Sequence, residues 1–380
     1  MHRAHSPPGE IHMNTQSHQM TNAAEVPSPA LLIYPDRVRE NLQHMLRLTG
    51  GPARLRPHVK THKLAEIIQL KLAAGIDKFK CATIAEAEMT AHAGALDVML
   101  AYQPVGPNVR RFVELTRAFP ATRFSVIADD AAVMRTLSAA LSAAGATTAV
   151  LLDVDCGMHR TGIAPGPQAM AIYKELATLP ALVPGGLHAY DGHNNLIDIA
   201  ARTAQCAQDM APVRQLRSDL QAAGLPVPRL VSSGTRTFPI HATHSDVECS
   251  PGTTVLSDTG TAQFPDLNFQ HAALVFTRVI SKPGENLVCV DLGHKAIASE
   301  NPHPRVTLLG LEDAQAVQQS EEHLVLETPL AGNYKVGDCI YGIPRHICPT
   351  VALYMSAVIV ENQRATTTWR ITARDRTITI

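Results

Sequence analysis

The segment Arg-Pro-His-Val-Lys-Thr-His-Lys (56–63) carries a lysine, Lys60, between two histidines. A lysine amine that its surroundings keep neutral can attack a carbonyl carbon and form a Schiff base. The alternative is a solvated surface lysine, which is the commoner situation. Pro57 excludes a helix interior and favours an extended segment that ends at Lys60. A position at the end of a strand, beside two histidines, modestly favours a reactive lysine over a surface lysine.

Two turns of small residues could hold an anion. Val-Ser-Ser-Gly-Thr-Arg-Thr (231–237) and Ser-Pro-Gly-Thr-Thr (250–254) each follow a short strand-like run. Successive backbone N–H groups and hydroxyls in such turns can surround a phosphate. Each turn is weak evidence alone, because turns of this composition are common.

Three further side chains follow apolar strand-like runs. Arg160, in Asp-Val-Asp-Cys-Gly-Met-His-Arg (153–160), could bind an anion through its planar guanidinium, or equally pair with Asp153 or Asp155. Tyr190 and His193 lie in His-Ala-Tyr-Asp-Gly-His (188–193), and spacing alone assigns no role to His193.

The segment Pro-Arg-His-Ile-Cys-Pro-Thr (344–350) places His346 and Cys348 two residues apart. If the segment is extended, both side chains point the same way and can reach one ion. Imidazole and thiolate suit Zn²⁺, and two protein ligands leave positions for water or substrate, as in a catalytic site. A buried cysteine beside an unrelated histidine is the alternative.

Strand-like and helical segments alternate along the first two thirds of the chain, and helices are expected over 64–74 and 197–223. This pattern predicts an α/β fold, a (β/α)8 TIM barrel, with reactive side chains at the carboxyl ends of its strands. An open doubly wound sheet is the alternative, weakened by the lack of Gly-x-Gly-x-x-Gly after the first strand. The expected strands are 54–60, 78–83, 97–101, 123–128, 149–155, 185–190, 229–233 and 246–250.

From about residue 268 the pattern changes to short strand-like runs separated by turn residues, which predicts an all-β domain. We therefore expect a loosely attached or disordered tail over 1–28, a barrel over 29–265 and a β domain over 266–380. The β domain would carry the metal site.

The composition excludes several classes of protein. A formal net charge of −1 argues against a nucleic-acid partner, and no run of 18 apolar residues predicts a membrane span. The 7 cysteines are odd in number and scattered, which suits a reducing cytoplasm and not a disulfide framework.

The order of these motifs along the chain resembles the D-threonine aldolase and D-serine dehydratase family. These are fold-type III pyridoxal-phosphate enzymes related to alanine racemase, and the resemblance spans about residues 28–375. It implies an alanine racemase-like barrel with a C-terminal β domain, a homodimer, and a small amino-acid substrate.

The resemblance also assigns site residues. Lys60 would be the Schiff-base and catalytic lysine, and Arg160 would lie by the cofactor or substrate. Apart from the resemblance, we take His193 as the candidate base for aldol cleavage. His346 and Cys348 would bind a divalent metal, zinc before manganese or magnesium. The residues that would flank the cofactor or hold its phosphate are Tyr190, Ser233, Gly234, Thr235, Gly252 and Thr253.

The resemblance leaves the reaction open. The first expectation is a metal-assisted lyase that cleaves β-hydroxy-D-amino acids to glycine and an aldehyde, as D-threonine aldolase does. The alternative is β-elimination to an α-keto acid and ammonia, as in D-serine dehydratase, and Cys348 favours it because the aldolases tend to carry aspartate there. An amino-acid racemase would need a second base, which the sequence does not identify. A non-catalytic cofactor carrier would need no metal motif.

Overall fold

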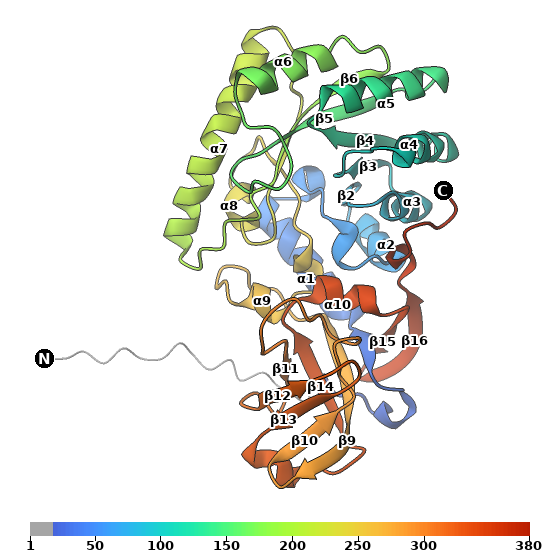
Figure 1. The fold of residues 1–380 in the computed structure, drawn as a ribbon, viewed down its shortest axis with the longest axis vertical. Coiled ribbons are helices and arrows are strands. Elements are labelled where there is room, and N and C mark those ends of the chain that lie inside the picture. The colour runs from blue at the N-terminus through green and yellow to red at the C-terminus, as the bar shows by residue number, and fades with distance from the viewer. Residues whose placement is uncertain (1–17) are drawn as a thin grey trace, which may run out of the picture.

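The computed structural model of the protein describes residues 18–380, which form a barrel and a β domain stacked along the long axis (Figure 1). Seven parallel strands pair in chain order around the barrel. They are β2 (Lys78–Cys81), β3 (Asp97–Leu100), β4 (Arg123–Ala128), β5 (Thr148–Val154), β6 (Leu182–Ala189), β7 (Leu230–Ser232) and β8 (Glu248–Cys249).

The expected strand over 54–60 is the exception. Leu55 makes an isolated parallel bridge to Cys249, and His58 makes one to Lys80, so this segment joins the two edges of the sheet. It forms no ladder of its own, because Pro57 between the two bridges has no N–H to donate. The barrel therefore closes through two bridges, and a 3-10 turn over Val59–Thr61 follows them.

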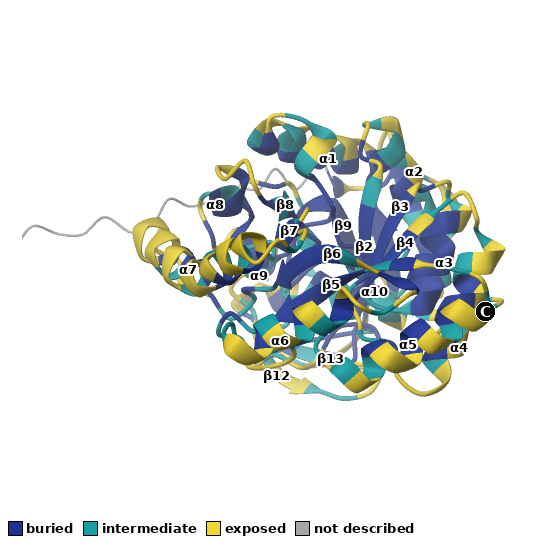
Figure 2. Cartoon of the chain, turned by 90° about the horizontal axis from the view of Figure 1, so that it is seen from above, coloured by how far each residue is buried: buried dark blue, intermediate teal, exposed yellow. Residues whose placement is uncertain are grey.

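Helices cover the outside of the barrel (Figure 2), as the alternating pattern predicted. Their inner faces are apolar: α4 buries Val109, Phe112 and Leu115, which recur at helical spacing. Burying one such side chain stabilises the fold by about 1.5–3 kcal/mol. The helices are α1 (Pro35–Thr49), α2 (Ala65–Ala73), α3 (Ile84–His92), α4 (Pro107–Ala118), α5 (Ala131–Ala143), α6 (Pro167–Leu176), α7 (Ile199–Ala222) and α8 (Phe238–Ala242).

One glycine is essential to the barrel sheet. Gly186 in β6 has φ +110°, and a Cβ there would lie 2.0 Å from the carbonyl oxygen of Arg229. The pairing of β5 with β6 shifts register between Val150 and Leu151, beside this glycine. The two neighbouring strands approach so closely that no other residue fits.

The β domain is built on one nine-stranded sheet. Short strands separated by turns form here, as the pattern after residue 268 predicted, and helix α10 (Ile347–Leu353) interrupts them before β15 begins at residue 356. The strands are β9 (Ala273–Gly284), β10 (Leu287–Val290), β11 (Val306–Leu308), β12 (Gln315–Gln319), β13 (Leu324–Glu327), β14 (Cys339–Pro344), β15 (Ser356–Glu361) and β16 (Arg364–Arg370).

The beginning of the described chain also belongs to this sheet. Strand β1 (Ala30–Ile33) pairs antiparallel with β9 and parallel with β15, although the sequence placed it with the barrel. Of the tail expected over 1–28, residues 1–17 lie outside the described part. Residues 18–28 are not loosely attached: Met20 and Val26 are buried in the apolar cluster around β1, and the Thr21 N–H donates to the Gln363 carbonyl at 2.8 Å.

In the described part of the chain, no helix combines the length and apolarity that a membrane crossing requires. Helices α9 (Thr259–Ala262) and α10 lie where the barrel meets the β domain (Figure 1). The carboxyl ends of the barrel strands face this junction.

Candidate active site

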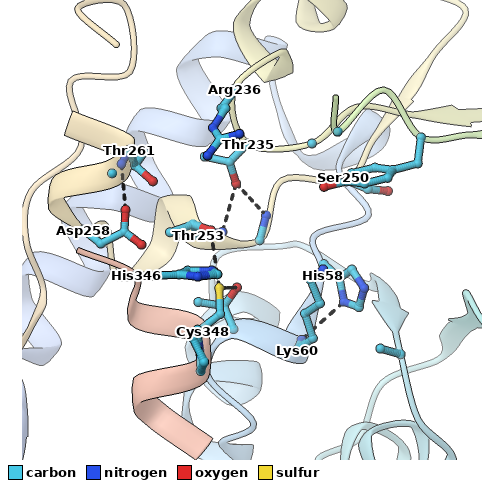
Figure 3. A pocket seen from close by; sticks show the side chains of 18 of the residues that line it. His58, Lys60, Thr235, Arg236, Ser250, Thr253, Asp258, Thr261, His346 and Cys348 are labelled. Carbon is cyan, nitrogen blue, oxygen red and sulfur yellow. Dashed lines mark hydrogen bonds between the residues drawn. The ribbon is translucent and has the colours of Figure 1, made fainter. Parts of the chain in front are cut away.

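A cavity of about 950 Å³ opens at the carboxyl ends of the barrel strands and reaches α10 of the β domain (Figure 3). Its walls come from the loops that follow β2, β3, β6, β7 and β8, which is where parallel barrels place their active sites. Eight of the residues singled out from the sequence line it: Lys60, Tyr190, Gly234, Thr235, Gly252, Thr253, His346 and Cys348.

Lys60 lies in the 3-10 turn after the bridge at His58 and is half-buried. Its backbone N–H donates to Nδ1 of His58 at 3.3 Å, which fixes the turn. The Lys60 Nζ lies 6.0 Å from the centre of the Tyr190 ring. Arg160 does not line the cavity, but its guanidinium lies 5.0 Å from the centre of the same ring. The structure therefore places two of the predicted residues, Lys60 and Arg160, around the ring of a third, Tyr190.

A buried chain of polar groups lies behind Tyr190. The Asp153 carboxylate accepts a hydrogen bond from Nδ1 of His188 at 2.6 Å, and His188 Nε2 lies 2.8 Å from Nζ of Lys80. With the ring proton on Nδ1, Nε2 of His188 is the acceptor for the Lys80 amine. The Lys80 Nζ is 5.4 Å from the centre of the Tyr190 ring.

Burial disfavours the charged forms of the basic groups here. Burial, followed by the charge of Lys60, lowers the pKa of Lys80 to about 7. Burial also holds the pKa of His58 well below its usual value, with the charges of Lys60 and Lys80 adding to the effect. Sequence reasoning missed Lys80, although strand alternation in Lys-Phe-Lys-Cys points it to the barrel interior.

The two anion-binding turns meet at one hydroxyl. Thr235 Oγ1 accepts hydrogen bonds from the backbone N–H groups of Gly252 at 3.2 Å and Thr253 at 3.0 Å. A Cβ on Gly252 would lie 3.0 Å from Thr61 Oγ1, and a Cβ on Gly234 would lie 3.1 Å from the Tyr190 ring. Glycine at both positions keeps the wall of the cavity open beside Lys60.

Ser233 does not face the cavity. It is buried with φ +74°, and its hydroxyl accepts the backbone N–H of Ser250 at 3.1 Å. Its role in this geometry is to hold the second turn, whose Ser250 does line the cavity.

The first turn is anchored by Asp191, which is fully buried. One carboxylate oxygen accepts the Gly234 N–H at 3.2 Å and the Thr237 hydroxyl at 2.8 Å, and the other lies 2.7 Å from Nε2 of His241. Within residues 18–380, Asp191, Cys206 and His241 are the group of three side chains whose ligand atoms lie close enough together to hold a metal ion. Sequence reasoning did not single out any of them.

His346 and Cys348 are brought together, but not in the extended geometry that the sequence predicted. His346 precedes α10 and Cys348 lies in its first turn, where Pro349 is also tolerated because no helical N–H is lost there. His346 Nδ1 lies 2.6 Å from Glu300 Oε1, and the Cys348 sulfur lies 3.2 Å from Thr61 Oγ1. The metal motif of the β domain thereby contacts the turn that holds Lys60.

The two side chains also interact with each other. Burial opposes ionisation of the Cys348 thiol, but the adjacent imidazole outweighs it and holds the thiol pKa below its usual value. A cysteine sulfur beside an imidazole, next to an open cavity, is a donor set that fits zinc.

His193 is separated from this constellation. Its Nε2 lies 2.9 Å from a carboxylate oxygen of Asp209 on α7, and it is not among the residues that line the cavity. The turn that carries Tyr190 into the cavity directs His193 toward the outer helix instead.

Two domain families match this chain. Residues 33–259 match the alanine racemase N-terminal domain, and residues 272–360 match the putative serine dehydratase domain. A 3-hydroxy-D-aspartate aldolase of Paracoccus denitrificans (strain Pd 1222) is 27% identical over 369 residues, covering 93% of each chain. A D-threonine aldolase of an Arthrobacter species is 27% identical over 361 residues, covering 92% of this chain and 93% of the relative.

A dehydratase is also similar. The D-threo-3-hydroxyaspartate dehydratase of Delftia sp. (strain HT23) is 25% identical over 369 residues, covering 90% of this chain and 96% of the relative. A variant of this enzyme with alanine in place of a cysteine was solved in a metal-free form, and it shares the fold with a TM-score of 0.81 at 22% identity over 92% of this chain and 98% of that one.

A solved D-threonine aldolase from Filomicrobium marinum superposes with a TM-score of 0.84 at 28% identity, covering 94% of this chain and 98% of that one. The predicted combination of an alanine racemase-like barrel with a β domain is confirmed by these matches. The chain belongs to the family defined by the alanine racemase N-terminal domain, here joined to a domain of the serine dehydratase type.

Proposed function

We propose that the protein is a pyridoxal-phosphate lyase that acts on β-hydroxy-D-amino acids, cleaving them to glycine and an aldehyde as a D-threonine aldolase does. The observation that carries the proposal is one cavity lined by Lys60, the joined turns at Thr235 and Gly252, and the His346–Cys348 pair. A racemase needs no such metal-binding pair, and the relatives at 25–27% identity are named aldolases or a dehydratase.

The residues present fit the cofactor. Lys60 would hold its aldehyde carbon, the turns over 233–235 and 252–253 would hold its phosphate, and Tyr190 would flank its ring. Arg160 lies behind that tyrosine, where it adds positive charge to the site. Bound in this way, pyridoxal phosphate supplies an electron sink for the bond that breaks at the substrate Cα.

His346 and Cys348 would hold a divalent metal, and a thiolate favours zinc over manganese or magnesium. A metal at this place lowers the pKa of a β-hydroxyl group or stabilises hydroxide as it leaves.

Side chains of the protein would hold and transfer the protons of the reaction. The Lys60 amine, which lines the cavity, would be the group that accepts a proton there. The chain of Asp153, His188 and Lys80 lies behind Tyr190 and is shielded from water. His193 was expected as the base for aldol cleavage, but its pairing with Asp209 makes it a weaker candidate for that role.

The second candidate is the dehydratase reaction, in which the Cα–H and the Cβ–O bonds break to give an α-keto acid and ammonia. Two observations favour it: Cys348 at the metal position and the 25% identity to a D-threo-3-hydroxyaspartate dehydratase. In this reaction Lys60 would take the Cα proton.

We also propose a homodimer and a cytoplasmic location. All seven cysteines are free, with Cys339 and Cys348 partly exposed, which agrees with a reducing compartment. Small amino acids are the substrates of the named relatives, and nucleic acid is not expected as a partner at a net charge of −1.

Product analysis tests the function. Purified protein is expected to be yellow, and Lys60→Ala is expected to lose this absorption while its far-ultraviolet circular dichroism stays unchanged. Incubation with D-threonine or D-threo-3-hydroxyaspartate followed by mass spectrometry should give glycine and an aldehyde.

An α-keto acid and ammonia would select the dehydratase instead, and the L-enantiomer of the substrate would select a racemase. Turnover that survives complete chelation would refute the metal assignment. A colourless protein that binds no pyridoxal phosphate would refute the proposed function altogether.

A further inference from the structure

Glu300 contacts His346 from outside the metal motif. Its Oε1 lies 2.6 Å from Nδ1 of the His346 imidazole, and Glu300 itself lines the cavity. It comes from the long connection between β10 and β11, about 46 residues before the histidine, so the motif alone does not reveal it.

The connection that carries Glu300 is hydrogen-bonded to helix α10, which follows His346. The buried N–H of Ala298 donates to Thr350 Oγ1 at 3.2 Å, and the Thr350 hydroxyl donates to the His346 carbonyl at 2.8 Å. From the opposite side, the buried Asp258 carboxylate accepts the N–H of Ile347 at 3.0 Å. The backbone around His346 is thus held on two sides, and Glu300 adds a contact to its ring.

The contact decides which nitrogen can bind a metal. A carboxylate accepts a hydrogen bond and cannot donate one, so a His346 ring that binds a metal beside Glu300 would keep its hydrogen on Nδ1 and offer Nε2 as the ligand. Metal-binding histidines commonly have such a partner, which fixes the tautomer and the ring orientation and makes the ligand more basic. The side chains of Glu300 and His346 are 47% and 44% exposed, so this ion pair adds little to folding stability.

We infer that Glu300 is a positioning residue of the metal site, holding the His346 ring so that its Nε2 and the thiolate of Cys348 face one ion. The inference rests on the proposed function for the presence of that ion. It assigns Glu300 no contact with substrate.

Zinc affinity measured without turnover tests this inference. Holoenzyme stripped with a chelator is titrated with zinc against a chromophoric chelator, comparing wild type with Glu300→Ala, Glu300→Asp and a control, Glu322→Gln. Glu322 is an exposed glutamate of the same domain that pairs with Lys295. We expect Glu300→Ala to bind zinc about 10–100-fold more weakly, Glu300→Asp to recover part of the loss, and Glu322→Gln to match wild type.

A second pair of variants distinguishes the positioning role of Glu300 from the metal site itself. His346→Ala and Cys348→Ala should lose the site, and the thermal unfolding midpoint of Glu300→Ala should stay close to that of wild type. Wild-type affinity in Glu300→Ala, while His346→Ala has lost the site, would overturn the role of Glu300 alone. Unchanged affinity in His346→Ala would overturn both this inference and the metal site of the proposed function.

Discussion

Lys80 is predicted to destabilise the folded protein near neutral pH. It is 3% exposed, and burial lowers its pKa from 10.5 to about 7, so at pH 7 about half of the folded molecules have lost a proton that the unfolded chain keeps. From these two values, the penalty is about 4 kcal/mol at pH 7 and about 2 kcal/mol at pH 9. The sign follows from the lowered pKa: the destabilisation by Lys80 is absent above pH 10.5 and grows as the pH drops toward 7.

Lys80→Met removes this penalty and also one hydrogen bond to His188, which contributes about 1 kcal/mol. We therefore expect the variant to be more stable than wild type by about 3 kcal/mol at pH 7 and about 1 kcal/mol at pH 9. Urea unfolding of both cofactor-free proteins measures the difference. Circular dichroism follows the whole fold, and fluorescence of Trp369, the single tryptophan, follows the β domain.

Lys71 is a matched comparison. It is fully buried on α2, its pKa is also lowered to about 7 by burial, and its amine lies 3.0 Å from His62 Nε2 rather than beside the cavity. Lys71→Met should show the same dependence on pH. If the stability difference between Lys80→Met and wild type does not change between pH 7 and pH 9, the prediction that folding lowers the pKa of Lys80 is wrong.

Two other substitutions test the closure of the barrel. Arg56 is fully buried and binds Asp97 at 2.6 Å and Glu248 at 2.7 Å. Arg56→Met leaves these carboxylates with their more exposed partners alone, Arg123 at 3.5 Å and Lys78 at 3.3 Å, and should cost about 3 kcal/mol of unfolding free energy; a loss below about 1 kcal/mol in urea would contradict the structure. Gly186→Ala places a Cβ 2.0 Å from a backbone oxygen and should cost about 4 kcal/mol or more, whereas Gly224→Ala, which has φ +78° but open space around it, should cost about 1 kcal/mol. Equal midpoints of thermal unfolding for the two alanine variants would show that the close approach at β6 is wrong.

Much of the molecule could be predicted from local sequence. Apolar runs and helical spacing follow directly from which side chains must be buried, so seven of the barrel strands, the helices over 64–74 and 197–223 and most of the strands after residue 268 were recognisable one at a time. Lys60 and the pair of His346 and Cys348 were recognisable for another reason. Each stands in a short segment where several reactive side chains lie within a few positions of one another.

The tertiary structure decided what local patterns leave open. Pairing of β1 with β9, bridging at His58 and the contact of Glu300 with His346 all join segments far apart in the chain, and no short-range periodicity encodes them. The neutral state of Lys80 likewise depends on complete burial beside His188. Local spacing sets which elements form, because it sets which faces are apolar, but only long-range packing sets which side chains share one desolvated cavity and therefore what chemistry they can do.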